Sequence, residues 1–185
     1  VTGLDVRGGG PASRESELMK PTAASGFINA VLLSGGSAFG LDAAGGVMEY
    51  LEEKNVGFDV GITKVPLVAQ SCIFDLSVGD MKVRPDKVMA YEACVNSENN
   101  NPSMGNAGAG MGATVGKLGG MATAMKGGLG SYAVQIGDLK VGAIVAVNAC
   151  GDIFDYDTHE IIAGLLTPDL KNFANTEQVI YQMCE

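Results

Sequence analysis

The sequence contains no tryptophan and only one histidine, and its four cysteines include no CxxC pair. Zinc centres use closely spaced Cys and His ligands, so these absences argue against a structural zinc site. A Ser-His-Asp triad is also disfavoured, because His159 lies in a polar segment and the pattern Gly-x-Ser-x-Gly does not occur. We therefore expect neither a metal ion nor another cofactor.

Basic residues are also scarce: the sequence has 12 Lys and Arg but 21 Asp and Glu, which gives a net charge of −9. This balance argues against binding nucleic acid or an anionic membrane surface. No signal peptide or transmembrane run is present, since the apolar stretch Val141–Val147 is far too short to span a bilayer. The surroundings of Cys72, Cys94, Cys150 and Cys184 predict buried free thiols, typical of a reducing cytoplasm.

Glycine is abundant instead. The 27 glycines are about twice the usual share of roughly 7%. They follow no collagen period, and they stand beside Ala, Val and Ile, which favours close backbone packing. The densest stretch, from Gly105 to Gly130, lacks the spacings of a P-loop and of GxGxxG, so phosphate binding is not favoured. At 185 residues, 46% of them hydrophobic, the chain fits one domain with a real core.

The pattern of apolar residues predicts an α+β layered protein. One amphipathic helix is expected from Asp42 to about Lys54, with Gly46 on its polar face. A polar loop should precede it near the N-terminus. The remaining predicted elements are a strand over Val65–Phe74, a helix over Asp86–Ser97, a hairpin of Ser131–Ile136 and Leu139–Asn148 with Gly137–Asp138 as its turn, and a weak final helix over Asn172–Cys184.

Two places are candidates for a functional site. The turn of Ser34, Gly35 and Gly36 precedes the first predicted helix, where free N–H groups bind anions. The same turn could also be a helix cap, which the sequence taken alone favours. Asn148 ends an apolar strand that we expect to be buried, and its amide could donate to an oxyanion. Asparagine also favours turns, so both interpretations of each place stay open.

Several segments, taken in order, resemble one family: the self-processing L-aminopeptidase/D-esterase and β-aminopeptidase family. The resemblance extends from about Asp5 to Gly164. It is carried by Leu33–Glu52, Val65–Val68, Ile73–Leu76, Arg84–Pro85, Gly108–Gly112, Lys126–Gly130 and Val141–Ala149.

The resemblance implies a four-layer αββα sandwich, similar to ornithine acetyltransferase and incomplete without a second chain. Members cut themselves before a Ser or Thr, which becomes the N-terminus of the β-chain and acts as nucleophile, with its α-amine as base. Residues 1–185 would then be a single domain, the α-chain portion of the precursor. The nucleophile would lie beyond it, with Asn172–Glu185 as the region before the cut.

The resemblance also implies roles for single residues. Asn148 matches an oxyanion-hole asparagine. Gln70 stands where better-studied members have a Glu near the substrate amine, and Cys72 where some have a Tyr. These two residues and the turn of Ser34, Gly35 and Gly36 are our candidates for substrate binding.

The implied activity is hydrolysis of amide or ester bonds in amino-acid or small peptide derivatives. An acyltransferase on the same scaffold and a non-catalytic small-molecule binding protein remain as alternatives. The expected partners are the β-chain of the same precursor and further αβ units in a homo-oligomer, in the cytoplasm.

Overall fold

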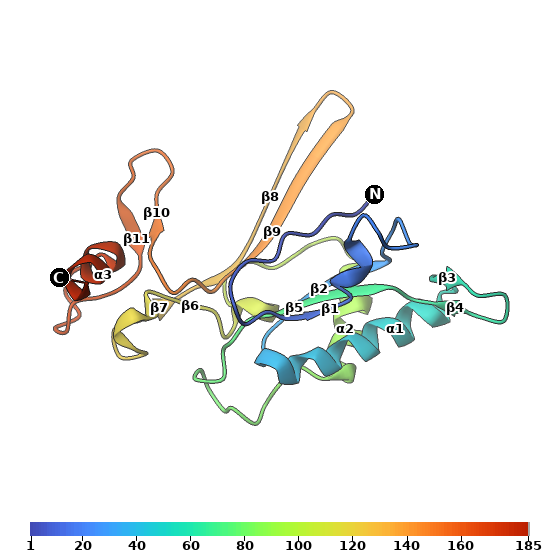
Figure 1. The fold of residues 1–185 in the computed structure, drawn as a ribbon, viewed down its shortest axis with the longest axis horizontal. Helices are drawn as coiled ribbons and strands as arrows, with labels where there is room; N and C mark the ends of the chain where they lie inside the picture. Colours follow the sequence, from blue (N-terminus) through green and yellow to red (C-terminus); the bar gives the residue numbers. More distant parts are fainter. Residues whose placement is uncertain (185) are drawn as a thin grey trace. The chain divides into compact units, whose positions relative to one another are not determined.

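A computed structural model describes residues 1–184 of the chain, which form two units (Figure 1). Unit 1 comprises Val1–Leu76 and Asp80–Pro102, and unit 2 comprises Ser77–Gly79 and Ser103–Glu185. Both contain helices and mostly antiparallel strands, which confirms the α+β class. The expectation of a single domain stays a prediction.

Unit 1 is built on a three-stranded sheet in the order β1-β5-β2. The central strand β5 runs parallel to β2 and antiparallel to β1. The polar segment near the N-terminus, predicted as a loop, contributes β1. The elements of this unit are β1 (Ala12–Arg14), η1 (Glu17–Met19), β2 (Ala30–Ser34), η2 (Ser37–Ala43), α1 (Ala44–Glu53), β3 (Phe58–Asp59), β4 (Lys64–Val65), β5 (Val68–Cys72) and α2 (Lys87–Ser97).

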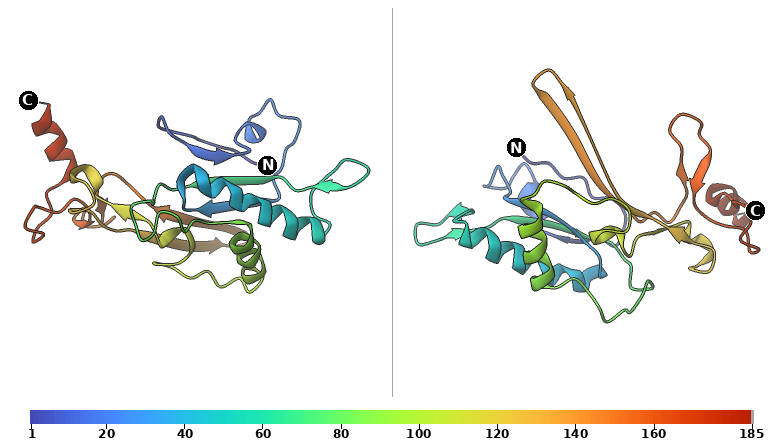
Figure 2. Two further views of the ribbon diagram at one scale, coloured as in Figure 1. Left: turned by 90° about the horizontal axis from the view of Figure 1, so that it is seen from below. Right: turned by 180° about the vertical axis from the view of Figure 1, so that it is seen from behind.

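The core of unit 1 lies between the sheet and α1, with α2 packed beside α1 (Figure 1, Figure 2). Its buried residues are small: Ala43, Ala44, Val47, Val68 and Ala90. Such side chains let the helices approach closely. The predicted strand Val65–Phe74 divides into β4 and β5 on either side of Pro66, which cannot donate a ladder hydrogen bond.

The predicted helices of unit 1 are confirmed, with one correction. The side chain of Asp86 accepts a hydrogen bond from Met89 N at 2.9 Å and so caps α2. Gly46, however, does not lie on a solvent-exposed face of α1. It is buried, and a Cβ placed on it would lie 1.9 Å from Lys87 O at the start of α2. Sequence periodicity assigns glycine no preferred face, so this helix contact was not predictable.

Unit 2 consists of short paired strands joined by turns. β6 pairs with β7 and β10 with β11, all antiparallel. His159 is exposed in the β10–β11 loop. The elements are η3 (Gly108–Gly110), β6 (Thr114–Val115), η4 (Lys117–Gly119), β7 (Met125–Lys126), β8 (Gly128–Ile136), β9 (Leu139–Val147), β10 (Ile153–Phe154), β11 (Ile161–Ala163) and α3 (Thr176–Met183).

The predicted hairpin is confirmed: β8 and β9 pair antiparallel from Gly128↔Val147 to Ile136↔Leu139, around the turn at Gly137. They extend as a long arm from unit 2 (Figure 1). The prediction that its second strand is buried is wrong for this chain, because β9 is exposed over Leu139–Val145. A two-stranded arm has no second layer of its own to cover it.

The cysteines were also only partly predicted. Cys72 is buried and Cys94 half-buried, but Cys150 and Cys184 are exposed; all four are free thiols. No helix among residues 1–184 combines the length and apolar character needed to cross a bilayer.

The contact of Gly46 with α2 gives a first prediction. Gly46→Ala should lower the free energy of unfolding by about 1–3 kcal/mol, because the methyl group would collide with the Lys87 carbonyl. This cost exceeds the gain of roughly 1 kcal/mol that alanine brings inside a helix. Urea unfolding measures it. The control is Gly142→Ala, where the nearest atom would be 3.7 Å away; an equal effect in both variants would contradict the prediction.

Candidate functional site

Asn148 follows the end of β9 in unit 2 and is half-buried. Its Oδ1 accepts a hydrogen bond from Thr114 N at 3.0 Å, and its main-chain oxygen accepts one from Lys117 Nζ at 2.9 Å. The bond to Oδ1 fixes the plane of the side-chain amide. It also places the donor atom Nδ2 on the far side of the amide from Thr114 N.

Lys117 was not singled out by sequence reasoning. Its Nζ donates to Thr114 O at 3.0 Å as well as to Asn148 O, so that one ammonium group joins β6 to the end of β9. Partial burial lowers the pKa of this amine, an effect that Cys150 opposes. The residue therefore both positions Asn148 and brings positive charge close to it.

The turn after Asn148 leads to Asp152, a second residue that sequence reasoning missed. Asp152 Oδ1 accepts from Leu165 N at 2.7 Å and from Thr176 Oγ1 at 2.8 Å. Asp152 Oδ2 accepts from Thr176 N at 2.6 Å. One carboxylate therefore holds the start of α3 and the segment after β11. The absence of a side chain at Gly164 provides the space for this carboxylate, because a Cβ there would lie 2.1 Å from Asp152 Oδ1.

The peptide bond between Asn175 and Thr176 has an unusual environment. Asn175 has φ 56° and ψ 102°, whereas a residue capping a helix N-terminus normally has an extended, negative-φ backbone. A non-glycine residue in such a conformation stores about 1–3 kcal/mol of strain. Thr176 is only 6% exposed, and both its hydroxyl and its N–H bind Asp152. A buried, activated hydroxyl thus follows directly on a strained residue.

The sequence did hold a weak signal for this bond. Only three threonines and no serine follow Asn148, namely Thr158, Thr167 and Thr176. The pair Asn175–Thr176 opens a helical pattern, and a helix start is the usual interpretation of such a pair. The strain at Asn175 and the contact with Asp152 are visible only in the folded chain.

The candidates for substrate binding lie in unit 1, where three of them form a buried polar cluster. Gln70 Nε2 donates to Gly40 O at 2.7 Å and to Ser34 Oγ at 2.9 Å. Ser34 Oγ lies 3.1 Å from Cys72 Sγ. Burial raises the pKa of the Cys72 thiol, and the bond to Ser34 partly offsets this. Gln70 Oε1 is buried and has no hydrogen-bond partner within residues 1–184.

The turn of Gly35 and Gly36 already holds an anionic group from the same unit. Gly36 N donates to Asp75 Oδ1 at 2.7 Å, and a Cβ on Gly35 would lie 2.0 Å from Asp75 Oδ2. Gly36 itself has φ 82°, which glycine adopts without strain. The carboxylate of Asp75 therefore stands where the anion of the first interpretation would bind.

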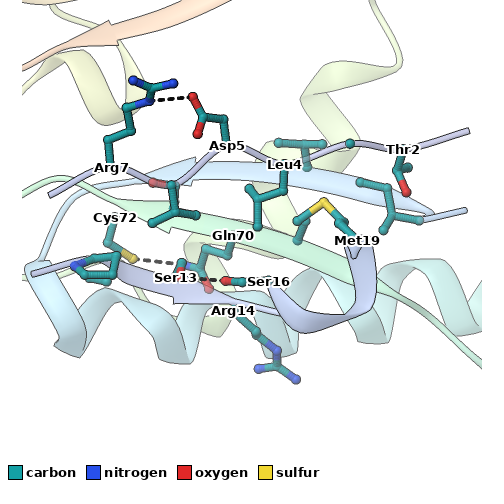
Figure 3. Close-up of a pocket in the computed structure, with 18 of the residues that line it drawn as sticks. Thr2, Leu4, Asp5, Arg7, Ser13, Arg14, Ser16, Met19, Gln70 and Cys72 are labelled. Carbon is teal, nitrogen blue, oxygen red and sulfur yellow. Dashed lines mark hydrogen bonds and ion pairs between the residues drawn. The ribbon is translucent and has the colours of Figure 1, made fainter. Parts of the chain in front are cut away.

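A cavity of about 640 Å³ lies in unit 1 between the N-terminal segment and the strands β1 and β5 (Figure 3). Gln70 and Cys72 are among its lining residues, together with the ion pair of Arg7 and Asp5. Asn148 belongs to unit 2. Among the described residues, no group of three His, Cys, Asp or Glu side chains could hold a metal.

Comparison with known proteins gives a consistent result. The profile of peptidase family S58 matches residues 1–175. An uncharacterized aminopeptidase of Mycobacterium leprae is 42% identical over 166 residues, which cover 85% of this chain and 44% of that protein. An uncharacterized aminopeptidase of Mycobacterium tuberculosis is 40% identical over 158 residues, covering 84% and 43%.

A third relative is a 6-aminohexanoate-oligomer endohydrolase of Kocuria sp., 33% identical over 129 residues, which cover 70% of this chain and 36% of that protein. The chain thus spans less than half the length of these curated relatives.

The buried amide of Gln70 gives a prediction on stability. Gln70→Glu replaces the donor Nε2 by an oxygen facing the Gly40 carbonyl, and should lower the free energy of unfolding by about 1–3 kcal/mol at neutral pH. Burial favours the protonated acid, so its folded pKa should be raised. The deficit should then be small below the unfolded pKa of about 4.3 and grow as pH rises.

Urea unfolding at several pH values measures this deficit. Gln135→Glu, in the exposed hairpin arm, is the control and should change little. A Gln70→Glu protein as stable as the wild type at neutral pH would show that the amide donor is not needed.

Proposed function

Because this chain belongs to peptidase family S58, we propose that it forms part of a self-processing hydrolase that cleaves amide or ester bonds of amino-acid or small peptide derivatives. The names of the relatives support an amide-cleaving enzyme: two are aminopeptidases and one is an oligomer endohydrolase. The activity belongs to the whole protein, which includes a β-chain as partner.

The observation that carries the self-processing proposal is the environment of Thr176. Self-cleavage before a threonine needs a hydroxyl held next to the preceding carbonyl, and it is favoured by backbone strain that is released when the peptide bond breaks. Thr176 is buried with its hydroxyl bonded to a carboxylate, and Asn175 before it is strained. We therefore assign the nucleophile to Thr176, within this chain, in place of a residue beyond Glu185.

The proposed cut begins with attack of Thr176 Oγ1 on the carbonyl carbon of Asn175, which closes a five-membered ring. The C–N bond then breaks and leaves an ester between the Asn175 acyl group and the Thr176 oxygen. Water hydrolyses this ester, giving a carboxylate on Asn175 and a free α-amine on Thr176. The amine then serves as base when the same hydroxyl attacks a substrate carbonyl.

Asn148 supplies the second part of the proposed site. In the proposed site the side-chain amide of Asn148, whose Oδ1 accepts from Thr114 N, donates from Nδ2 to the negative oxygen of the tetrahedral intermediate. Lys117 holds Asn148 from its main-chain side and adds a positive charge. The short turn from Asn148 to Asp152 links this amide to the residue that binds Thr176.

The four-layer αββα sandwich also belongs to the proposal. In unit 1 the helices cover the face of the sheet that carries Val68, while Val31 on β2 is 68% exposed. In unit 2 every second pair of the hairpin arm, from Gly128↔Val147 to Ile136↔Leu139, lies on the same face, and all residues of these pairs are apolar or aromatic. Surfaces of this kind require a covering layer, which the β-chain and further αβ units would supply.

Thr176→Ala should abolish splitting of the full-length protein between Asn175 and Thr176, because no hydroxyl remains to attack. Intact-mass measurement over time follows the reaction in the variant and in the wild type. Hydroxylamine should accelerate splitting of the wild type by capturing the ester. Thr167→Ala is the control and should split normally; splitting at the same bond in Thr176→Ala would refute the assignment.

Asn148→Asp isolates the donor of the side-chain amide. The new carboxylate keeps an acceptor for Thr114 N but loses Nδ2, so both self-cleavage and substrate turnover should slow by ~10²–10³. Rates come from intact mass and from hydrolysis of an aminoacyl amide. Asn106→Asp, at an exposed position of unit 2, should react at the wild-type rate. Wild-type rates in Asn148→Asp would remove Asn148 from the site.

A further inference from the structure

We propose that Asp152 is the proton-transfer residue of self-cleavage, moving a proton from the hydroxyl to the departing nitrogen of Thr176. This inference rests on the proposed function, since it assigns a role within the cut before Thr176. Its basis is the geometry of a single carboxylate, which binds both groups of Thr176 that exchange a proton during the reaction.

The two oxygens of Asp152 bind different atoms of the same residue. Thr176 Oγ1 donates to Oδ1 at 2.8 Å, and Thr176 N donates to Oδ2 at 2.6 Å. Both distances are well within hydrogen-bond range. The carboxyl group that accepts the proton of the hydroxyl therefore already lies within hydrogen-bond distance of the nitrogen that has to receive it.

The step balances in atoms and charge. Asp152 Oδ1 removes the proton from Thr176 Oγ1 as the oxygen bonds to the carbonyl carbon of Asn175, whose own oxygen becomes negative. When this intermediate collapses, the C–N bond breaks and the nitrogen takes a proton from the Asp152 carboxyl group. The carboxylate is then restored, and the products of this step are an ester and a neutral amine. Water consumes the ester afterwards.

The surroundings of Asp152 support this role. Its third partner is Leu165 N at 2.7 Å, a neutral donor, and no ion pair involves Asp152 among residues 1–184. No cationic side chain among residues 1–184 therefore competes with Thr176 for the carboxylate oxygens. Gly164 leaves space for the carboxylate, because a Cβ at this position would lie 2.1 Å from Asp152 Oδ1.

A purely structural reading assigns Asp152 only the anchoring of α3, and the two readings predict different behaviour. Asparagine at this position has nearly the same size and keeps one acceptor oxygen, for Leu165 N or for Thr176 N, but it cannot accept and return a proton. In the full-length protein, Asp152→Asn should therefore fold and split ~10²–10⁴-fold more slowly than the wild type. Asp152→Ala should be equally slow, and added formate should restore part of its splitting rate.

Splitting is followed by intact mass, and folding by urea unfolding of the same samples. Asp138→Asn, in the exposed turn of the hairpin arm, is the matched control and should split at the wild-type rate. Thr176→Ala is included to test the proposed function by itself. If Thr176→Ala splits at this bond, the proposed function fails. If it stays intact while Asp152→Asn splits within a few-fold of the wild type, only the role of Asp152 fails.

If the Asp152 variants do not fold, a measurement on the wild-type protein can still test the role of Asp152. Proton transfer within the rate-limiting step slows a reaction in D₂O, so splitting of the wild type should be slower there than in H₂O. An unchanged rate would overturn the assignment, as would formate failing to restore splitting in a folded Asp152→Ala protein.

Discussion

The carboxylate of Asp152 is the contact on which the functional part of unit 2 depends. It joins three pieces of chain: the turn after β9, the segment at Leu165 and the start of α3. Each bond to a charged acceptor contributes about 1.5–3 kcal/mol, more than a neutral bond. The contact also requires Gly164, and Gly116 in turn, because a Cβ on Gly116 would lie 2.0 Å from the carbonyl carbon of Gly164. Close backbone packing and one carboxylate thus fix the position of Thr176 together.

The short strands around this contact cannot satisfy their own main-chain groups, and lysine side chains do so in their place. Lys117 Nζ binds the carbonyls of Thr114 and Asn148. Lys126 Nζ binds three more, Gly110 O, Met111 O and Ala113 O, at 2.8–3.1 Å. Buried carbonyls left without donors would be costly, so these ammonium groups explain how a glycine-rich stretch with so little regular structure stays folded. Lys117 also brings positive charge close to Asn148.

Sequence reasoning was most successful where local rules decide. The helix capped at Asp86, the hairpin turn at Gly137 and the α+β class follow from capping, turn chemistry and periodicity. The family resemblance singled out Asn148, whose role in the site stays a prediction. Sequence reasoning failed where a tertiary contact decides. The pattern of α1 does not show that Gly46 packs against α2, and nothing in the sequence near Asp152 shows that its carboxylate binds Thr176. Thr176 was passed over because the nucleophile was expected beyond Glu185 and because the pair Asn175–Thr176 indicates only a helix start.

The strain at Asn175 is too small to drive the proposed cut alone. Stored strain of about 1–3 kcal/mol raises a rate by roughly one to two orders of magnitude. Spontaneous cleavage of a peptide bond needs far more, so the remaining acceleration has to come from orientation of the hydroxyl, stabilisation of the oxyanion and transfer of the proton. Strain has a different consequence. The strain is released when the bond between Asn175 and Thr176 breaks. Rejoining the two ends would have to restore this strain, so the fold that presents the bond for attack also disfavours the reverse reaction.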